Sequence, residues 1–265
     1  MDLQLQGKRA IVTGGSRGIG FAIAAALAAE GVHVVIAARD LARLQAAAAE
    51  LNERGGGTVH AIAADTGRDD SVRDLVQRSA ETLGGVDILV NNAANQVVGN
   101  PPPDLAGTTD EAFFEDVNVK VVGYLRTARA VAPLLTAQGW GRIINVSGLG
   151  ARQTRSIVRT IRNVSIAGLT KNLADELGRH GVNVTVVHPG PTRTPELTAS
   201  LTAAALDRGA GVHELERELV DNAVDRLVDC TEVADVVTFL ASPRSSAING
   251  DAVAVGGGAL GAVYY

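Results

Sequence analysis

A turn with three closely spaced glycines, Gly14, Gly18 and Gly20, is the stretch of this sequence best suited to binding a nucleotide. Glycine lets the chain turn tightly and lets a ligand approach bare backbone. An apolar run at 9–12 precedes the turn and a helical pattern at 19–30 follows it. The N-terminus of such a helix offers unpaired N–H groups and a positive dipole end to a pyrophosphate. This context predicts dinucleotide binding, and an ordinary strand-to-helix turn is the alternative.

Two arginines near this turn favour NADP(H) over NAD(H). A carboxylate at the end of the second strand would bind the ribose 2′-hydroxyl of NAD(H), whereas an arginine would favour the 2′-phosphate of NADP(H). That strand ends in Ala38 and Arg39, and Arg17 lies in the glycine turn, so two guanidinium groups are available. The carboxylate of Asp40 would favour NAD(H) instead, unless Asp40 caps the helix that begins at Leu41. The alternative for both arginines is a solvated surface position.

The elements that must position these residues alternate regularly along the chain. Helical patterns separate short runs rich in β-branched residues, which predict strands at 9–12, 32–37, 58–63, 86–91, 142–147, 182–188 and 252–255. We expect an α/β fold with a single Rossmann-type, doubly wound parallel sheet of about seven strands and helices on both faces. No linker or repeat divides the chain, so 1–265 is predicted to be one dinucleotide-binding domain. Thr108 and Glu111 are spaced as a capping box for a helix that runs to about 136. The irregular stretch 193–229 is expected to be a lid over the substrate.

The spacing Gly-x3-Gly-x-Gly after Thr13 resembles that of the short-chain dehydrogenase/reductase family. Further motifs are similar to the family's: Asn91-Asn92-Ala93-Ala94 after the fourth strand, Ser147 at the end of the fifth, and Pro189-Gly190 after the sixth. The resemblance covers about the whole chain. It implies an NADP(H)-dependent oxidoreductase that acts on a small organic molecule. It also implies a homodimer or homotetramer formed through the helices expected at 109–136 and 156–179.

The resemblance further implies roles for individual residues. Asp65 would hydrogen-bond the adenine ring, with a helix cap as the alternative. Ser147 would orient the substrate carbonyl, with a turn serine as the alternative, and Asn118 would be the family's active-site asparagine. Asn91 would brace the sheet beside the cofactor. The implied cofactor-binding residues are Gly14, Ser16, Arg17, Gly18, Ile19, Gly20, Arg39, Asp65, Asn91, Ala93, Pro189, Gly190, Thr192 and Thr194.

The resemblance breaks at the family's catalytic Tyr-x3-Lys pair. Counting back nine residues from Gly168, Arg159 takes the place of the tyrosine and Asn163 that of the lysine. No tyrosine lies between Tyr124 and Tyr264, so a shifted register cannot restore the pair. Arginine, with a pKa above about 12, is a poor acid, so ordinary ketone reduction needs another proton donor.

Three arginines lie at helical spacing around this position. Arg155, Arg159 and Arg162 fall at i, i+4 and i+7, so they share one helix face. If that face lines the pocket, it suits an anionic substrate or a developing negative charge. If it faces solvent, it is only a polar stripe. The predicted catalytic residues are Ser147, Asn118, Arg159 and Asn163.

Composition excludes several classes of partner. A net charge of −5 and a pI near 5.6 argue against nucleic acid or an anionic membrane surface as the main partner. The longest apolar run, 21–29, is about half the length of a membrane span, and no signal peptide is visible. A single cysteine, Cys230, excludes an internal disulfide and fits a cytoplasmic location. No metal site is predicted.

Three functions fit this pattern. The favoured one is an NADP(H)-dependent oxidoreductase with an altered proton path, in which water, Ser147 or the substrate donates the proton. Reduction of an imine or another cationic carbon would need no such donor. The second is a non-redox enzyme, such as a lyase, hydratase or isomerase, on the same scaffold. The third is a catalytically silent, cofactor-binding subunit.

Overall fold

Seven parallel strands form the central sheet of the computed structural model, which describes residues 1–95, 104–154 and 156–260. Their order is β3-β2-β1-β4-β5-β6-β9. The strands are β1 (Arg9–Thr13), β2 (His33–Ala38), β3 (Val59–Ala63), β4 (Ile88–Asn91), β5 (Gly141–Val146), β6 (Val182–Pro189) and β9 (Ala252–Val255). The predicted strand ends agree with these to within two residues, and the predicted doubly wound α/β fold is confirmed.

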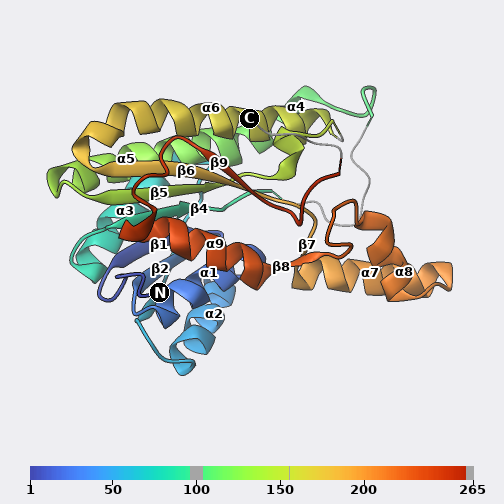
Figure 1. Ribbon diagram of the computed structural model, residues 1–265, viewed down its shortest axis with the longest axis horizontal. Coiled ribbons are helices and arrows are strands. Elements are labelled where there is room, and N and C mark those ends of the chain that lie inside the picture. Colours follow the sequence, from blue (N-terminus) through green and yellow to red (C-terminus); the bar gives the residue numbers. More distant parts are fainter. Residues whose placement is uncertain (96–103, 155, 261–265) are drawn as a thin grey trace.

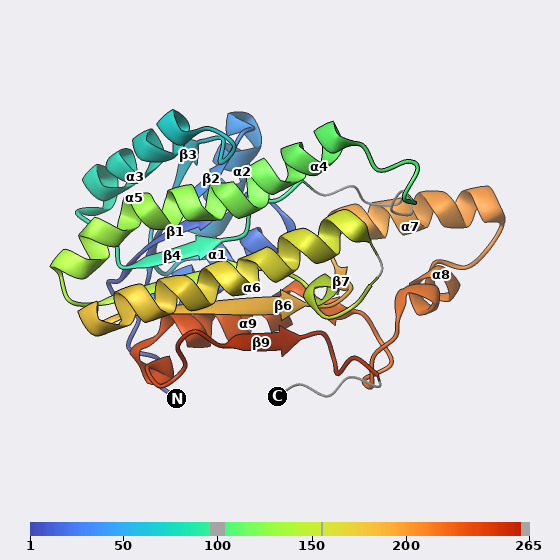
Figure 2. The same ribbon diagram turned by 90° about the horizontal axis from the view of Figure 1, so that it is seen from above.

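Helices cover both faces of this sheet (Figures 1 and 2). One layer consists of α1 (Gly18–Ala29), α2 (Leu41–Glu53) and α9 (Cys230–Ala241). The other consists of α3 (Asp69–Leu83), α5 (Gly123–Ala137) and α6 (Ile157–Leu177). Because successive side chains of a strand point to opposite faces, Val12 packs in the first layer's core and Ile11 in the second's. The strands are therefore apolar on both sides, which explains their continuous hydrophobic runs.

The strand order reverses beside β1, which pairs with β2 on one side and with β4 on the other. Open α/β sheets bind ligands in the crevice at the carboxyl ends of the strands beside such a reversal. The glycine turn follows β1 directly, and Asn92 follows β4. The fold therefore brings these two segments to the same crevice.

The helix expected from Thr108 to about 136 differs from the prediction in two ways. Its N-cap is Thr109, whose Oγ1 accepts a hydrogen bond from the N–H of Ala112, whereas the Thr108 hydroxyl donates to the main-chain oxygen of Asp104. The predicted capping box is therefore wrong by one residue. The helix is also interrupted, because a π-helical turn, η1 (Asn118–Val122), lies between α4 (Asp110–Val117) and α5. Such a turn changes which side chains face a given neighbour, and π-helical turns are frequent at functional sites.

The stretch 193–229 is mostly helical rather than irregular. It contains α7 (Pro195–Arg208) and α8 (Val212–Leu219), which extend beyond the carboxyl ends of the strands (Figure 1). The two ends of this stretch pair as short strands, β7 (Thr192–Arg193) with β8 (Val228–Asp229). Arg193 Nη1 also donates a hydrogen bond to Asp229 Oδ1 at 2.8 Å. Thr194 caps α7 by accepting from the N–H of Leu197.

Short 3-10 turns complete the described chain, and they are η2 (Leu149–Ala151), η3 (Gly178–His180) and η4 (Pro243–Ser245). Within the described residues, no helix combines the length and apolar character needed to cross a membrane.

Candidate active site

Two polar residues tie the glycine turn to the neighbouring strand. Thr13 Oγ1 accepts hydrogen bonds from the main-chain N–H groups of Asn92, at 2.9 Å, and Ala93, at 3.1 Å. The Asn92 side chain donates in return to the main-chain oxygens of Thr13 and Gly14. Sequence reasoning assigned neither side chain this role, although short polar residues at the ends of adjacent parallel strands were the available signal.

The geometry of the glycine turn suits a pyrophosphate. A Cβ atom on Gly20 would lie 2.2 Å from the main-chain oxygen of Gly14, so only glycine lets α1 start this close to the turn. Gly18, at φ +55°, has the left-handed conformation that glycine favours, and the nearest atom to a Cβ built there is 3.5 Å away. That atom belongs to Thr194, so the first turn of α1 packs beside Thr194, and Gly18 lines a cavity in which an anion could meet the helix N-terminus.

A cavity of about 210 Å³, here called the nucleotide cavity, lies over this turn and the ends of β2, β3 and β4. Its lining also includes Asp40, Arg43, Thr66 and Asn92. The predicted cofactor-binding residues that line it are Gly14, Ser16, Arg17, Gly18, Ile19, Arg39, Asp65, Ala93 and Thr194. Gly20 lies behind this surface, packed against the turn.

Three guanidinium groups line the nucleotide cavity, one more than the sequence predicted. Arg39 lies between the end of β2 and the cap of α2, and Arg43, which sequence reasoning missed, lies in the first turn of α2. Asp40 accepts from the N–H of Arg43 at 3.0 Å, which confirms that Asp40 caps α2. Arg17 Nη1 lies 3.0 Å from Glu196 Oε1, so the glycine turn and the first turn of α7 are joined by an ion pair.

Two predicted cofactor contacts make hydrogen bonds within the protein. Asp65 lines the nucleotide cavity, and its Oδ1 also accepts from the N–H of Gly67 at 2.9 Å. Asn91 is fully buried in the sheet. Its Nδ2 donates to Asn145 Oδ1 at 3.0 Å, and its Oδ1 accepts from Thr127 Oγ1 at 2.7 Å. Asn91 therefore braces β4 against β5 and α5 instead of facing the nucleotide cavity.

A second cavity of about 630 Å³, here called the large cavity, adjoins the first. The two cavities share Ile19, Asn92, Ala94, Asn95 and Thr194. Helices α7 and α8 contribute apolar residues to one wall, among them Leu197, Leu201 and Leu215. The predicted site residues that line the large cavity are Ile19, Ser147, Arg159, Asn163, Pro189, Gly190, Thr192 and Thr194.

Ser147 and Asn163 meet on the wall of the large cavity. Ser147 Oγ donates to the main-chain oxygen of Asn163 at 3.1 Å. Asn163 is 5% exposed, and its Oδ1 has no hydrogen-bond partner among the described residues. A buried acceptor without a partner is costly, so this oxygen suits a ligand hydroxyl that donates to it.

Asn118 does not line the large cavity, whereas the other predicted catalytic residues, Ser147, Arg159 and Asn163, do. Asn118 Nδ2 donates to the main-chain oxygen of Gly67 at 3.2 Å, which directs the side chain toward the segment after β3. Of the residues described in η1, Lys120 lines the large cavity. Lys120 is 3% exposed, and its Nζ donates to the main-chain oxygen of Ser147 at 2.8 Å. Sequence reasoning missed this residue, although a single lysine among valines was a visible signal.

Electrostatics at Lys120 make its ammonium more acidic than that of an exposed lysine. Burial lowers the pKa of Lys120 well below its ordinary value, and the nearby charge of Arg162 lowers it further. The carboxylate of Asp116 acts in the opposite direction. Burial also lowers the pKa of the Arg159 guanidinium, with Arg162 adding to the effect and Asp116 opposing it.

The arginine face of α6 is partly buried. Arg162 Nη1 lies 2.5 Å from Asp116 Oδ1 and 2.7 Å from Oδ2, and both Arg159 and Arg162 line the large cavity. Arg162 Nε has no hydrogen-bond partner among the described residues. Arg155, the third member of the predicted stripe, lies outside the described residues. Arg159 and Arg162 therefore face the large cavity, and this is the arrangement for which the sequence predicts an anionic ligand.

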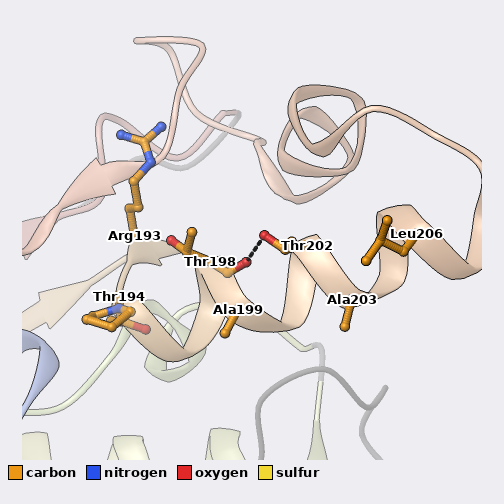
Figure 3. A pocket seen from close by; sticks show the side chains of 8 residues that line it. Arg193, Thr194, Thr198, Ala199, Thr202, Ala203 and Leu206 are labelled. Atoms are coloured by element: carbon orange, nitrogen blue, oxygen red, sulfur yellow. Dashed lines mark hydrogen bonds between the residues drawn. The ribbon is translucent and has the colours of Figure 1, made fainter.

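A further groove follows another face of α7 and is open to solvent (Figure 3). Thr202 Oγ1 donates there to the main-chain oxygen of Thr198 at 2.9 Å, so this hydroxyl is used within its own helix. Across the described ranges, no three His, Cys, Asp or Glu side chains gather in a way that could hold a metal ion.

Comparisons with known proteins agree with this geometry. A family model described as Enoyl-(Acyl carrier protein) reductase matches residues 14–259. The uncharacterized oxidoreductase YvrD of Bacillus subtilis is 32% identical over 98% of this chain and 99% of its own length. L-sorbose reductase from Gluconobacter frateurii, solved with NADPH and L-sorbose, superposes with a TM-score of 0.93 at 30% identity over 99% of this chain and 100% of that one. A short chain dehydrogenase from Burkholderia cenocepacia in complex with NADP gives a TM-score of 0.81 at 34% identity over 96% and 98% of the two chains.

Proposed function

This chain belongs to the short-chain dehydrogenase/reductase family of oxidoreductases, and we propose that it is NADP(H)-dependent, with Arg159 and Asn163 in place of the tyrosine and lysine. Its substrate is a small organic carbonyl, imine or related molecule that bears an anionic group. The observation that carries the proposal is the junction of the two cavities. The nucleotide cavity has a phosphate-binding turn, and the adjoining large cavity has Ser147, Arg159 and Asn163 on its wall.

The residues of the nucleotide cavity fit NADP(H). The start of α1 at Gly18, which lines the nucleotide cavity, would hold the pyrophosphate. Arg39 and Arg43 would bind the 2′-phosphate, because guanidinium groups match phosphate oxygens in charge and geometry. The Asn163 Oδ1 acceptor would take a hydrogen bond from a hydroxyl of the nicotinamide ribose. Solved relatives bound to NADPH and NADP support this choice. When bound, the reduced nicotinamide would supply a hydride.

The charges around the large cavity support an anionic substrate. Among the described lining residues, the cations are Lys120, Arg159, Arg162 and Arg208, and the only anion is Glu218, which forms an ion pair with Arg208 at 3.4 Å. Asp116 neutralises Arg162 from behind the wall. Arg159, on the same helix face, would bind a carboxylate or phosphate of the substrate while Ser147 orients the carbonyl.

Helices α7 and α8, within the predicted stretch 193–229, would act as the lid of the single domain. Leu197, Leu201 and Leu215 form the wall that this lid would present to a substrate. We also propose that the chain assembles into a homodimer or homotetramer in the cytoplasm. Exposed apolar side chains on α6, including Ile161 and Val164, support contacts between copies.

A matched pair of probes tests this function. NADPH and NADH binding are measured by fluorescence, and oxidation of NADPH is followed with 2-ketobutyrate and with its methyl ester. The same assays are run on other keto acids and on cyclic imino acids with their esters. We expect tighter binding of NADPH than of NADH, and faster turnover of acids than of their esters.

Two variants identify the residue responsible for that preference. Arg159→Met should abolish the preference for acids, whereas Arg179→Met, on an exposed residue just beyond the end of α6, should leave it intact. Absence of NADPH binding would refute the proposed cofactor. Equal turnover of acids and esters by the unmodified protein would refute the anionic substrate alone.

A further inference from the structure

Lys120 differs from the other lysines of this chain in its surroundings. The chain has three lysines, Lys8, Lys120 and Lys171. Lys8 lies over the Trp140 ring at 4.1 Å, and Lys171 forms an exposed ion pair with Asp175. Lys120 is the one that is buried, at 3% exposure, on the wall of the large cavity. Burying an ammonium costs free energy unless a counter-charge pairs with it or it has a functional role, so the position of Lys120 needs an explanation.

The nearest carboxylate does not supply that explanation by direct pairing. Both oxygens of Asp116 are bound by Arg162 Nη1. Lys120 Nζ donates instead to the main-chain oxygen of Ser147, at 2.8 Å. An ammonium has three donors, and this contact uses one of them. The amine is thus anchored beside Ser147, and Lys120 and Ser147 both line the large cavity.

Other candidate acids near this position are unsuited to giving a proton at neutral pH. Tyr124 is fully buried and donates to the main-chain oxygen of Val146, and burial raises the pKa of its phenol. Burial and nearby cations lower the pKa of His188 to about 4, so its ring is neutral. Arg159 keeps its proton, because a guanidinium is a poor acid even when burial lowers its pKa.

We propose that Lys120 Nζ is the proton donor for reduction at this site, and hence a catalytic residue that the π-helical turn η1 places beside Ser147. This inference rests on the proposed function. The carbonyl carbon of the substrate gains a hydride, which comes from the reduced nicotinamide. The electron pair of the broken C=O π bond moves to oxygen, which takes one proton from the Lys120 ammonium. The resulting neutral amine regains its proton from water in the large cavity.

The charged and titratable groups around Lys120 suit this role. Asp116 from α4 favours the ammonium, whereas Arg162 from α6 opposes it. Tyr124 from α5 and His188 from β6 are neutral at pH 7. Burial together with Arg162 brings the pKa of Lys120 down from its ordinary value. A general acid works best when its pKa lies near the operating pH.

The presence of only three lysines allows a direct test that needs no substrate. The protein is labelled with ¹⁵N-lysine, and the three Nζ signals are titrated by NMR from pH 5 to 11. The signal of Lys120 is identified by its loss in Lys120→Met. We expect it to titrate at a lower pH than the signals of Lys8 and Lys171. Titration of Lys120 together with the other two would overturn the proposal.

Two variants separate proton donation from a structural role. Lys120→Arg keeps the positive charge but cannot give up a proton, and Lys120→Met removes both. We expect each to lower kcat/KM by about 10²- to 10⁴-fold with the best keto acid, while the Kd for NADPH stays within about threefold. Lys171→Met is the control and should leave both values unchanged.

Rescue of activity by Lys120→Arg would assign Lys120 a purely electrostatic or structural role and overturn proton donation. Circular dichroism would show whether Lys120→Met folds; Lys120→Arg provides the test if it does not. Failure of the unmodified protein to bind NADPH would refute the proposed function, and the NMR titration would still decide whether Lys120 has the properties of an acid.

Discussion

Arg162 Nη1 contacts both carboxylate oxygens of Asp116, at 2.5 and 2.7 Å, and so joins α6 to α4 behind the large cavity. The two side chains are only 10% and 12% exposed. The pair keeps the Arg162 charge compensated and leaves Lys120 to bond with Ser147. One buried contact thus compensates the charge of Arg162 next to Lys120.

Removing one partner of this pair should destabilise the fold. Asp116→Ala would leave the Arg162 guanidinium buried without its carboxylate, so we expect the free energy of unfolding to fall by about 3–5 kcal/mol. Urea denaturation followed by circular dichroism measures the change. Asp175→Ala, which breaks the exposed ion pair with Lys171, is the control and should cost less than about 1 kcal/mol. An equally small loss in Asp116→Ala would show that water enters and solvates Arg162.

His188 should make stability depend on pH in the acidic range. Its pKa is about 4 in the folded protein because burial and nearby cations disfavour the imidazolium, against about 6.5 in an unfolded chain. Between these values the unfolded chain binds more protons, so stability is complete above pH 6.5 and falls as the pH drops toward 4. The loss attributable to His188 amounts to roughly 3 kcal/mol.

The variant His188→Asn isolates this contribution. Its amide oxygen could still accept the hydrogen bond that the Gly148 N–H gives to His188 Nδ1. We expect urea midpoints measured at pH 4.5 and 7.5 to differ less in this variant than in the unmodified protein. His60→Asn, at an exposed position on β3, is the control and should leave the pH dependence as it is. An unchanged slope in His188→Asn would mean that other groups cause the acid sensitivity.

Arg39 and Arg43 should determine the choice of cofactor. The double variant Arg39→Ala/Arg43→Ala loses the guanidinium groups expected at the 2′-phosphate. Because charge-assisted hydrogen bonds contribute about 1.5–3 kcal/mol, we expect the Kd for NADPH to rise by about 10- to 100-fold. NADH lacks this phosphate, so its Kd should change by less than about twofold. Fluorescence titration of both cofactors measures the effect.

Arg78→Ala is the matched control for that pair, because Arg78 lies on α3 in an exposed ion pair with Asp74. It should bind both cofactors as the unmodified protein does. Weakening of NADPH and NADH to the same extent in the double variant would contradict recognition of the 2′-phosphate.

Restoring the family's pair should restore its chemistry. Arg159→Tyr with Asn163→Lys places a phenol and an ammonium on the wall of the large cavity, so we expect kcat/KM for a neutral ketone, such as methyl 2-ketobutyrate, to rise by about 10-fold or more. Because the new phenol would donate the proton, adding Lys120→Met should cost less in this background than in the unmodified protein. Oxidation of NADPH at 340 nm measures both effects. No gain in the double variant would mean that the pocket differs from the family's beyond these two positions.

Contiguous residues were enough to predict the sheet, its layers and the nucleotide turn. Strand runs such as 182–188 depend on local hydrophobic pattern, and the turn at Gly14 to Gly20 depends on the spacing of glycines between a strand and a helix. The helix cap at Asp40 could also be predicted from the sequence, because its hydrogen bond with the N–H of Arg43 spans only three residues. Each of these features is decided within a few residues of chain.

The position of Lys120 depended on contacts between distant segments. The π-helical turn η1 lies in the middle of a helix whose pattern reads as continuous, and it changes which of Asn118 and Lys120 faces the large cavity. The hydrogen bond from Lys120 joins residues 27 positions apart, and the ion pair from Arg162 to Asp116 spans 46. Side-chain partners at such separations are chosen by how helices pack on the sheet, and packing is a property of the folded chain as a whole.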